Sequence, residues 1–509
     1  MPNAIIDIGS RSIKLVIGEK KGDDIAIIES LKNTFSIAND TFLKERISRE
    51  TINQTVNILE KYKQVLKDYG VTDVKVIATT AVREARNKDI FVDTVSRKTG
   101  LNVEVLTVGD IVYYMDSYLS YKLKNDYPIH KKNVLIAELG SGSMDISVME
   151  QGFTLMSIGL PLGTTRLRQL ASKLEGSFKD VSNALSEYVV NELSYAKRAF
   201  AGVEIDDIII IDENYSAYAR NIITNIKKDA SFWNIEEKDV KMMLDNLVGK
   251  SAQAIAQEYN IPIDGADTVM AYAVVLNAFY TAMKGKQVYA LEISLAESIL
   301  ANILLEIELS KKYNKTNQLV SAVNFICRRY NADLKHGSYV ASMSEKIFND
   351  LYEQLGIKKD DVLYLTLAAH LHDVGMFIHN RSHHIHSEYV ISTINMFRLT
   401  EAEVKMIACI ARYHRKGAPS KNHMVYNSLA PDKQILVQKL SSILRMANAL
   451  DRSHKQKVKK VEVKTHNNDI TIIVSVEDNF ILEEEDFSDK KELFEEITGS
   501  KISLSVKGL

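Results

Sequence analysis

The sequence predicts an α/β protein whose later part is mainly helical. Strand-like and helix-like runs alternate over about the first 305 residues, which is typical of α/β domains. One phrase appears twice, each time between two strand-like runs, and reads IDIGSRS at residues 6–12 and AELGSGS at residues 137–143. The pattern then becomes almost continuous helix up to about residue 454, and this region holds ten of the twelve histidines. We therefore expect two related α/β domains followed by a histidine-rich helical domain.

Composition and charge restrict the class of protein. A length of 509 residues suggests roughly three to four domains. The net charge of −2 does not indicate a general surface for polyanions, so no specific nucleic acid is expected and a phosphate-rich ligand must meet a local patch. The only cysteines, Cys327 and Cys409, have no metal or redox spacing. The first residues read as a strand rather than a secretory signal, and no apolar run of about 20 residues is present, so we expect a cytoplasmic protein without a membrane partner.

The first α/β domain is expected over residues 1–125. Residues 4–30 read as a three-stranded meander. A helix is predicted at about 50–69, with Ser48 as its N-cap and Gly70 as its stop. A strand at 74–78, a helix at about 87–99 ended by Gly100, and a strand at 103–106 complete the domain.

The second α/β domain is expected over residues 126–305 and restarts with the repeated phrase. A long helix at about 180–200 and strands at 208–211 and 288–291 follow. Helix dominates residues 306–455. Residues 456–509 alternate as strand, turn at 467–469, strand, helix and strand, which predicts a small α/β segment.

Each repeated phrase has the composition of a phosphate-binding hairpin. Backbone N–H groups and hydroxyls of small residues can cradle a phosphate, and an acid beside them can hold a cation against it. Asp7 and Glu138 are these acids. The alternative is a pair of ordinary hairpin turns. The predicted phosphate donors are Gly9, Ser10, Ser12, Gly140, Ser141, Gly142 and Ser143.

Several phrases, in order, resemble the exopolyphosphatase/guanosine pentaphosphatase (Ppx/GppA) family of the actin-like ATPase superfamily. They are AIIDIGSRSIKLVIGE, ATTAVREARN, LIAELGSGSMDIS and SIGLPLGTTRL, followed in the helical region by HLHDVG, ARYHRKGAP and LRMANALDRSH. The resemblance implies two actin-like (ribonuclease H-like) ATPase domains around a cleft, an all-helical HD-like domain, and often a homodimer. It also implies Mg²⁺-dependent release of terminal phosphate from polyphosphate or guanosine pentaphosphate, and makes Arg83 a candidate phosphate clamp.

The sequence departs from this family where the catalytic base is expected. An ungapped alignment places Ile111 at that position, and a shift of one places Val112 there; Asp110 is the only nearby acid. Where the family has a glutamate in its second loop, this sequence has Asp145, whose side chain is one methylene shorter. A displacement of a catalytic group by about 1 Å can lower the rate by about a hundredfold.

Further positions also differ from the family pattern. Residues 212–215 lack the glycine that the family has there, and Gly265 and Ala296 stand at positions where the family has arginines. Two hypotheses follow. In one, Asp145 and Glu138 are catalytic and Asp7 and Glu138 organise Mg²⁺. In the other, an impaired family member binds nucleotide, alarmone or polyphosphate as a sensor.

The histidine-rich region resembles the metal site of HD phosphohydrolases. His336, His372 and Asp373 fit three ligand positions for a second divalent metal, and His386 and His414 are further candidates. The fourth position is Asn448, a weaker ligand, unless Asp451 three residues later substitutes for it. The alternative is a scaffold of hydrogen-bonded histidines. Nearby cations either line a groove for an anionic chain or form a solvated face; they are Arg412, Arg415 and Lys416.

Overall fold

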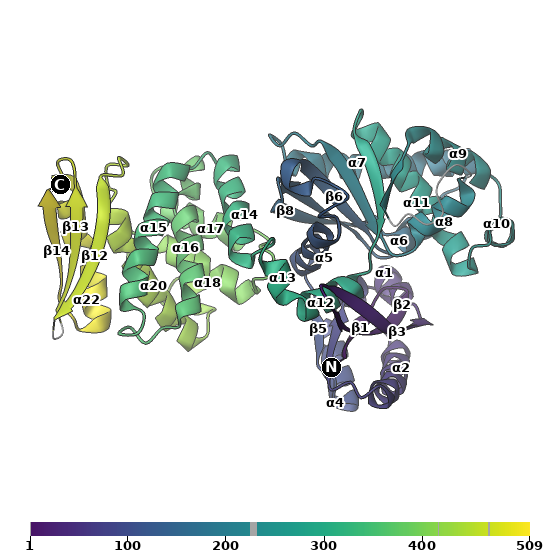
Figure 1. Cartoon of the computed structure of the whole chain (residues 1–509), viewed down its shortest axis with the longest axis horizontal. Helices are drawn as coiled ribbons and strands as arrows, with labels where there is room; N and C mark the ends of the chain where they lie inside the picture. Colours follow the sequence, from purple (N-terminus) through teal and green to yellow (C-terminus); the bar gives the residue numbers. More distant parts are fainter. Residues whose placement is uncertain (1, 224–231, 416, 467–468, 509) are drawn as a thin grey trace. The chain divides into compact units, whose positions relative to one another are not determined.

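The chain forms two compact units, residues 1–314 and 315–509 (Figure 1). This computed structural model describes residues 2–223, 232–415, 417–466 and 469–508. The first unit contains two mixed sheets with helices against them, and the second is helical with one small sheet. This arrangement confirms the α/β class. The finer division at residues 125, 305 and 455 stays a prediction.

The first sheet has the strand order β3-β2-β1-β4-β5. Its first three strands form an antiparallel meander, and β4 and β5 continue from β1 in parallel. The strands are β1 (Asn3–Ile8), β2 (Ser12–Lys21), β3 (Asp24–Thr34), β4 (Asp73–Ala78) and β5 (Val103–Val105). The helices of this region are α1 (Ala38–Lys44), α2 (Arg49–Asp68), α3 (Thr80–Arg83), α4 (Lys88–Thr99) and α5 (Val108–Lys122).

The predicted helix boundaries in this region are confirmed to within two residues. The Ser48 hydroxyl accepts a hydrogen bond from the Thr51 backbone N–H and caps α2. Gly100 ends α4 with a φ of 72°, a left-handed conformation that glycine adopts without a Cβ clash. Thr107 and Asp110 form a capping box that starts α5.

Helices cover both faces of the first sheet. Side chains alternate along a strand, so Ile6 of β1 packs in one core with α2 and α4, whereas Ile5 packs in another with α5 and α12 (Leu295–Leu304). Helix α12 follows the second sheet in sequence but returns to the first, where Ile299 and Leu300 are fully buried. The strand that carries the first repeated phrase is therefore held from both sides.

The second sheet repeats the arrangement of the first and adds one strand at its edge. Its order is β10-β11-β9-β6-β7-β8; β6 to β8 are an antiparallel meander, and β9 and β11 lie parallel to β6. The strands are β6 (Asn133–Leu139), β7 (Met144–Glu150), β8 (Phe153–Leu160), β9 (Asp207–Asp212), β10 (Phe232–Ile235) and β11 (Gln287–Glu292). The accompanying helices are η1 (Ile129–Lys131), α6 (Thr164–Ala171), α7 (Phe178–Ala199), α8 (Tyr215–Ile222), α9 (Glu237–Leu247), α10 (Ala252–Tyr259) and α11 (Ile263–Ala282).

The helical region begins with α13 (Glu306–Ser310) and continues through the second unit. Its helices are α14 (Lys315–Arg329), α15 (Leu334–Leu351), η2 (Lys359–Asp361), α16 (Val362–Leu371), η3 (Val374–Phe377), α17 (His383–Ser392), α18 (Glu401–Arg412), α19 (Met424–Asn427) and α20 (Pro431–Ala449). In the described part of the chain, no helix is both long and apolar enough to span a bilayer.

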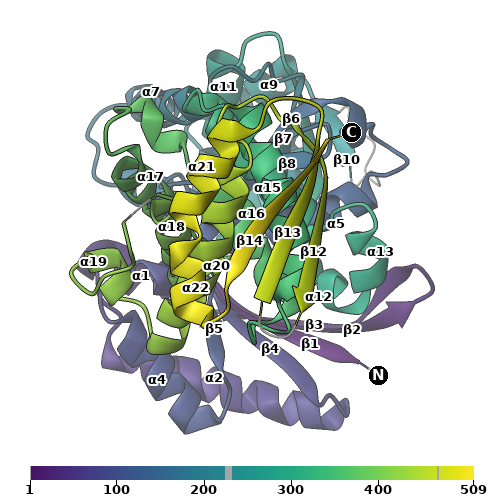
Figure 2. The ribbon, with the colours of Figure 1, turned by 90° about the vertical axis from the view of Figure 1, so that its left-hand side faces the viewer.

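The closing segment has the predicted alternation of strands and helix. Its sheet, in the order β12-β13-β14, stands with its strands side by side in Figure 2. Residues 467 and 468 of the predicted turn lie outside the described residues. The elements are β12 (Val458–His466), β13 (Asp469–Val476), α21 (Ile481–Lys490), α22 (Glu492–Thr498) and β14 (Ile502–Gly508).

Candidate functional site

The two repeated phrases fold into hairpins with the same turn. The first hairpin (residues 7–14) joins β1 to β2, and the Gly9 N–H donates to the Ser12 carbonyl at 3.0 Å. The second hairpin (residues 138–145) joins β6 to β7, and the Gly140 N–H donates to the Ser143 carbonyl at 3.0 Å. The sequence repeat is thus a structural repeat.

Both hairpins line one cavity of about 140 Å³ in the first unit, the hairpin cavity. A Cβ built on Gly142 would lie 2.4 Å from Ser10 Oγ, so the second turn approaches the first as closely as glycine allows. The hydroxyls of Thr80 and Ser143 are hydrogen-bonded at 2.8 Å. Ser10 and Ser141 therefore lie close enough to contact one ligand. The predicted donors that line the cavity are Gly9, Ser10, Ser12, Gly140, Ser141, Gly142 and Ser143.

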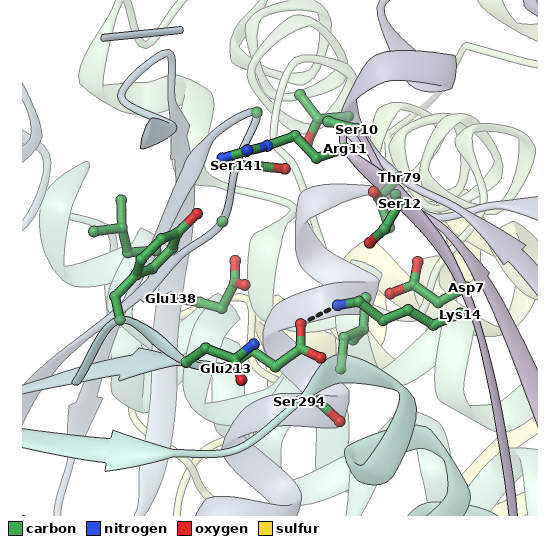
Figure 3. Close-up of a pocket in the computed structure, with 18 of the residues that line it drawn as sticks. Asp7, Ser10, Arg11, Ser12, Lys14, Thr79, Glu138, Ser141, Glu213 and Ser294 are labelled. Carbon is green, nitrogen blue, oxygen red and sulfur yellow. Dashed lines mark hydrogen bonds and ion pairs between the residues drawn. The ribbon is translucent and has the colours of Figure 1, made fainter. Parts of the chain in front are cut away.

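Three carboxylates of the two hairpins line the same cavity, and two of them are cross-strand neighbours; Asp7 and Asp145 are buried, and Glu138 is partly exposed. Glu138 on β6 lies opposite Asp145 on β7, so the two side chains share one face of the sheet. Asp7 enters from the first hairpin (Figure 3). Burial raises the pKa of Asp145 to about 6, against the opposing charge of Arg83, and raises the pKa of Asp7 to about 6. Burial, followed by repulsion from Asp145 and Asp7, raises the pKa of Glu138 well above its usual value.

These carboxylates suit a hard divalent cation. Both oxygens of Asp145 and Oδ1 of Asp7 are buried and have no hydrogen-bond partner among the residues that the structure describes. A buried charge without a partner is costly, and a cation removes that cost. Mg²⁺ takes carboxylate oxygens together with waters and phosphate oxygens, and the acids of the hairpin cavity supply carboxylate oxygens. Asp7, Glu138 and Asp145 therefore fit Mg²⁺ held directly or through water.

Cationic side chains of the first hairpin reach across the cavity, and the sequence interpretation had not singled them out. Lys14 forms an ion pair with Glu213, drawn as the dashed line in Figure 3. The Arg11 guanidinium donates to Thr268 Oγ1 at 3.2 Å and to the Asp264 carbonyl at 3.0 Å. The signal for Lys14 was its spacing, because residues two apart on a strand share a face and Ser12 was already a candidate.

The departures from the family pattern have identifiable positions. Ile111 lines the hairpin cavity, so an apolar side chain occupies the place that the ungapped alignment assigns to the base. The Asp110 carboxylate accepts from the backbone and hydroxyl of Thr107 and is used as a helix cap. A Cβ on Gly265 would lie 2.4 Å from the Tyr218 ring, so Tyr218 occupies the space into which a side chain at this position would extend.

Arg83 does not belong to the described lining of the cavity. Its guanidinium donates to the Leu106 carbonyl at 3.0 Å and to Thr80 Oγ1 at 3.2 Å. Its charge lowers the pKa of Asp145 against the effect of burial. In this arrangement Arg83 contacts Leu106 and Thr80 and acts on the charge of Asp145 from outside the cavity lining. Its role as a phosphate clamp stays a prediction.

The predicted metal ligands of the second unit lie together in a histidine cluster, which consists of His336, His372, Asp373, His383 and His414. Each of the four imidazoles has a nitrogen within 4.0 Å of an Asp373 carboxylate oxygen. Burial lowers the pKa of His372 to about 4, so that imidazole is neutral at pH 7. The structure places His336, His372 and Asp373 near one another, but His372 belongs to neither of the metal-compatible groups found among the described residues, and the role of all three as metal ligands stays a prediction.

Other residues near the cluster differ from the sequence interpretation. His383, which the motif did not single out, joins the cluster, whereas His386 belongs to neither of the metal-compatible groups found among the described residues. The Asp451 carboxylate hydrogen-bonds His336 Nδ1 at 2.8 Å, so it holds that imidazole from behind. Asn448 lines the cavity that adjoins His336, Asp373, His383 and His414.

The predicted cationic group near His414 is divided. Arg415 lines the cavity beside the histidine cluster. Arg412 instead forms an ion pair with the largely buried Glu388. Lys416 lies outside the described residues.

The fold and the site define an α/β protein in which two matching hairpins line one cavity with hydroxyl and backbone donors and with acids. Residues 15–307 match the model of the Ppx/GppA phosphatase family, and residues 318–496 match that of Ppx/GppA phosphatase domain III. The chain therefore belongs to the Ppx/GppA phosphatase family. The HD-like character of its helical domain stays a prediction.

Relatives and solved structures agree with this assignment. A guanosine-5'-triphosphate,3'-diphosphate pyrophosphatase of Pseudoalteromonas translucida is 23% identical over 87% of this chain and 86% of its own. Exopolyphosphatase 1 of Mycobacterium bovis is 24% identical over 32% of this chain and 46% of its own. Among solved structures, the Ppx/GppA family member of Aquifex aeolicus has a TM-score of 0.51 at 22% identity, covering 60% of this chain and 98% of its own. An exopolyphosphatase from Cytophaga hutchinsonii has a TM-score of 0.52 at 17% identity, over 61% and 99%. These structures confirm the predicted actin-like fold.

Proposed function

We propose that the first unit hydrolyses the terminal phosphoanhydride of inorganic polyphosphate or of guanosine pentaphosphate. The observation that carries the proposal is the pair of matching hairpins that line one cavity with their donors and buried acids. Both substrates end in a phosphate chain of high negative charge, which one set of backbone and hydroxyl donors can hold. The names of the relatives cover both substrates, so we treat both as candidates.

Each part of the cavity has a role in this reaction. The two turns hold the terminal and penultimate phosphates from opposite sides, and Lys14 adds a positive charge where negative charge develops. Mg²⁺, when bound by Asp7 and Glu138, neutralises charge on the phosphates. Asp145 orients the attacking water, and its pKa of about 6 leaves it mostly ionised at pH 7. Ile111 excludes water from its side of the cavity.

The sensor alternative receives no support from the relatives, which are hydrolases by name. The cavity itself retains acids as well as donors, and a site for binding alone has no need of two adjacent carboxylates, of which Asp145 further raises the pKa of Glu138. We therefore favour turnover.

The test is phosphate release by the purified full chain from long-chain polyphosphate and from guanosine pentaphosphate, with and without Mg²⁺. The variant that should obstruct the cavity is Gly142→Ala, because its added Cβ lies 2.4 Å from Ser10 Oγ. The matched control is Gly140→Ala, whose Cβ meets its nearest atom at a milder 3.3 Å. We expect Mg²⁺-dependent release that Gly142→Ala reduces far more than Gly140→Ala does. Release from neither substrate, or equal release by the wild type and Gly142→Ala, would contradict the proposal.

A further inference from the structure

We infer that the second unit binds a divalent transition-metal ion through Asp373, His383 and His414, with a further coordination position open to an anionic, phosphate-bearing ligand. This site is separate from the hairpin cavity and independent of the function proposed for it. It shares only Asp373 with the three ligands that the sequence motif suggested.

The hydrogen bonds of the cluster fix which imidazole nitrogens carry protons. Nδ1 of His372 lies 2.7 Å from the Ala369 carbonyl oxygen, and Nδ1 of His414 lies 2.7 Å from that of Ala411. A carbonyl oxygen only accepts, so each Nδ1 must donate, and each neutral ring then has a bare lone pair at Nε2.

The same reasoning applies to His383, whose Nδ1 lies 2.9 Å from the Asn380 carbonyl oxygen. When each ring carries only this Nδ1 proton, its Nε2 is bare, and the Nε2 atoms of His383 and His414 lie next to Asp373 Oδ1. His383 Nε2 and His414 Nε2 lie 3.2 Å apart with no proton between them in the neutral rings. His372 Nε2 is buried, and no described residue forms a hydrogen bond with it. Lone pairs that face one another in a buried site are unfavourable unless a cation lies between them.

The spacing of three of these atoms matches a metal coordination polyhedron. Asp373 Oδ1 lies 3.2 Å from His383 Nε2 and 3.7 Å from His414 Nε2, and the third edge is the 3.2 Å between the two nitrogens. Metal–ligand bonds of about 2.1 Å in a tetrahedron place neighbouring ligands about 3.4 Å apart. Two of the three observed separations are slightly shorter than this value and one is slightly longer. Two imidazoles and one carboxylate favour a transition metal such as Zn²⁺, Mn²⁺ or Fe²⁺ over Mg²⁺, which prefers oxygen ligands.

Three protein ligands leave a position for an external ligand, and the surroundings indicate its charge. A cavity of about 390 Å³ adjoins the cluster, the cluster cavity, and positively charged side chains from three segments line it. Arg415 follows His414 directly, Arg452 follows α20, and the largely buried Lys490 ends α21 of the closing segment. A divalent metal with cations around it favours a phosphate group as the external ligand.

The metal is tested with Co²⁺, whose visible absorption distinguishes nitrogen-rich, low-coordinate sites from oxygen-only sites. The full chain is prepared with a histidine-free affinity tag, treated with chelator and titrated with Co²⁺. The variants are His383→Gln and His414→Gln, which retain side-chain volume in this buried cluster. The matched control is His379→Ala, an exposed histidine just before α17 that belongs to neither metal-compatible group.

We expect visible bands that saturate at one Co²⁺ per chain in the wild type and in His379→Ala, and at least about a tenfold weaker Co²⁺ affinity in each glutamine variant. Far-ultraviolet circular dichroism checks that the variants fold. Absence of the bands from the wild type, or their retention in both folded glutamine variants, overturns the metal site.

The anionic ligand is tested by adding inorganic phosphate to the Co²⁺-loaded chain. A shift of the bands that Gly142→Ala retains and Lys490→Met weakens supports a phosphate position in the cluster cavity. Bands that phosphate leaves unchanged overturn the open position and indicate a closed, structural metal ion. Phosphate release with Mg²⁺ reports on the hairpin cavity alone, so either site can fail without the other.

Discussion

The two hairpins of the first unit have the same turn but opposite charges facing their acids. In the first hairpin the residue opposite Asp7 is Lys14, and in the second the residue opposite Glu138 is Asp145. The first hairpin therefore carries its own cation, whereas the second places two carboxylates side by side. From this difference we propose that the first hairpin holds the phosphate, whereas the second binds a cation and positions water.

The largest effect is expected from the acid of the second hairpin. Glu138→Gln removes a cation ligand, and loss of several kcal/mol of charge stabilisation corresponds to about a thousandfold lower kcat. We expect Asp7→Asn to cost less, because Lys14 already compensates charge beside it. Initial rates of phosphate release against Mg²⁺ concentration measure both. A smaller loss in Glu138→Gln than in Asp7→Asn would reverse the assignment of the two hairpins.

The next effect concerns how tightly the first hairpin binds the substrate phosphate. Lys14→Met keeps the length of the side chain but removes its charge, so we expect KM for polyphosphate to rise about tenfold, with kcat changed less. Lys20→Met is the matched control, since Lys20 lies on the same strand but pairs with Glu308 outside the hairpin cavity. Steady-state kinetics measure KM in both variants. An equal KM in the two would show that Lys14 does not contribute to substrate binding.

A gain of function is expected at the apolar wall of the cavity. Ile111→Glu places a further acid group where the family has its base, and a positioned general base contributes about a hundredfold or more when its geometry is right. Without a supporting shell we expect about a tenfold rise in kcat. Ile111→Gln has the same size without the charge and separates packing from acid–base chemistry. If both variants lose activity alike, the wall is needed for its shape.

A further effect is on stability, and here the hairpins should differ in sign. A carboxyl group whose pKa rises on folding costs stability as pH increases from its unfolded pKa to its folded pKa. For Asp145, the change from 3.8 to about 6 corresponds to about 3 kcal/mol at pH 7.5. We expect Asp145→Asn to increase the free energy of unfolding by about this amount without divalent cations, with little change at pH 4.

Lys14→Met should instead destabilise, because it leaves Asp7 and Glu213 without their cation. Trp233, the single tryptophan, lies buried in the second sheet and reports urea unfolding of the first unit by its fluorescence. A loss of stability in Asp145→Asn at pH 7.5 would show that its carboxylate has a partner.

Local features of the fold were predictable because they depend on neighbouring residues. The Ser48 cap, the Gly100 stop and the two hairpins follow from side-chain chemistry within a few positions. The return of α12 to the first sheet was not predictable in the same way, since its apolar stripe does not specify which sheet it covers.

The site was predictable only in part for the same reason. The repeated phrase gave the donors and acids, but the Lys14–Glu213 pair joins positions 199 residues apart, and no local pattern encodes it. In the histidine cluster, the motif led to His336, His372 and Asp373. The position of His383 depends on how α17 packs against α18, which the sequence does not reveal directly. Asp451 was considered as a metal ligand, but it hydrogen-bonds the far nitrogen of His336.

The most direct test of the account is the kcat of Asp145→Asn at saturating polyphosphate and Mg²⁺, measured as phosphate release beside the wild type. If the second hairpin positions the attacking water through this carboxylate, kcat falls by at least about a hundredfold while polyphosphate still binds. An unchanged kcat in the folded variant would contradict the assignment of the chemistry to the second hairpin.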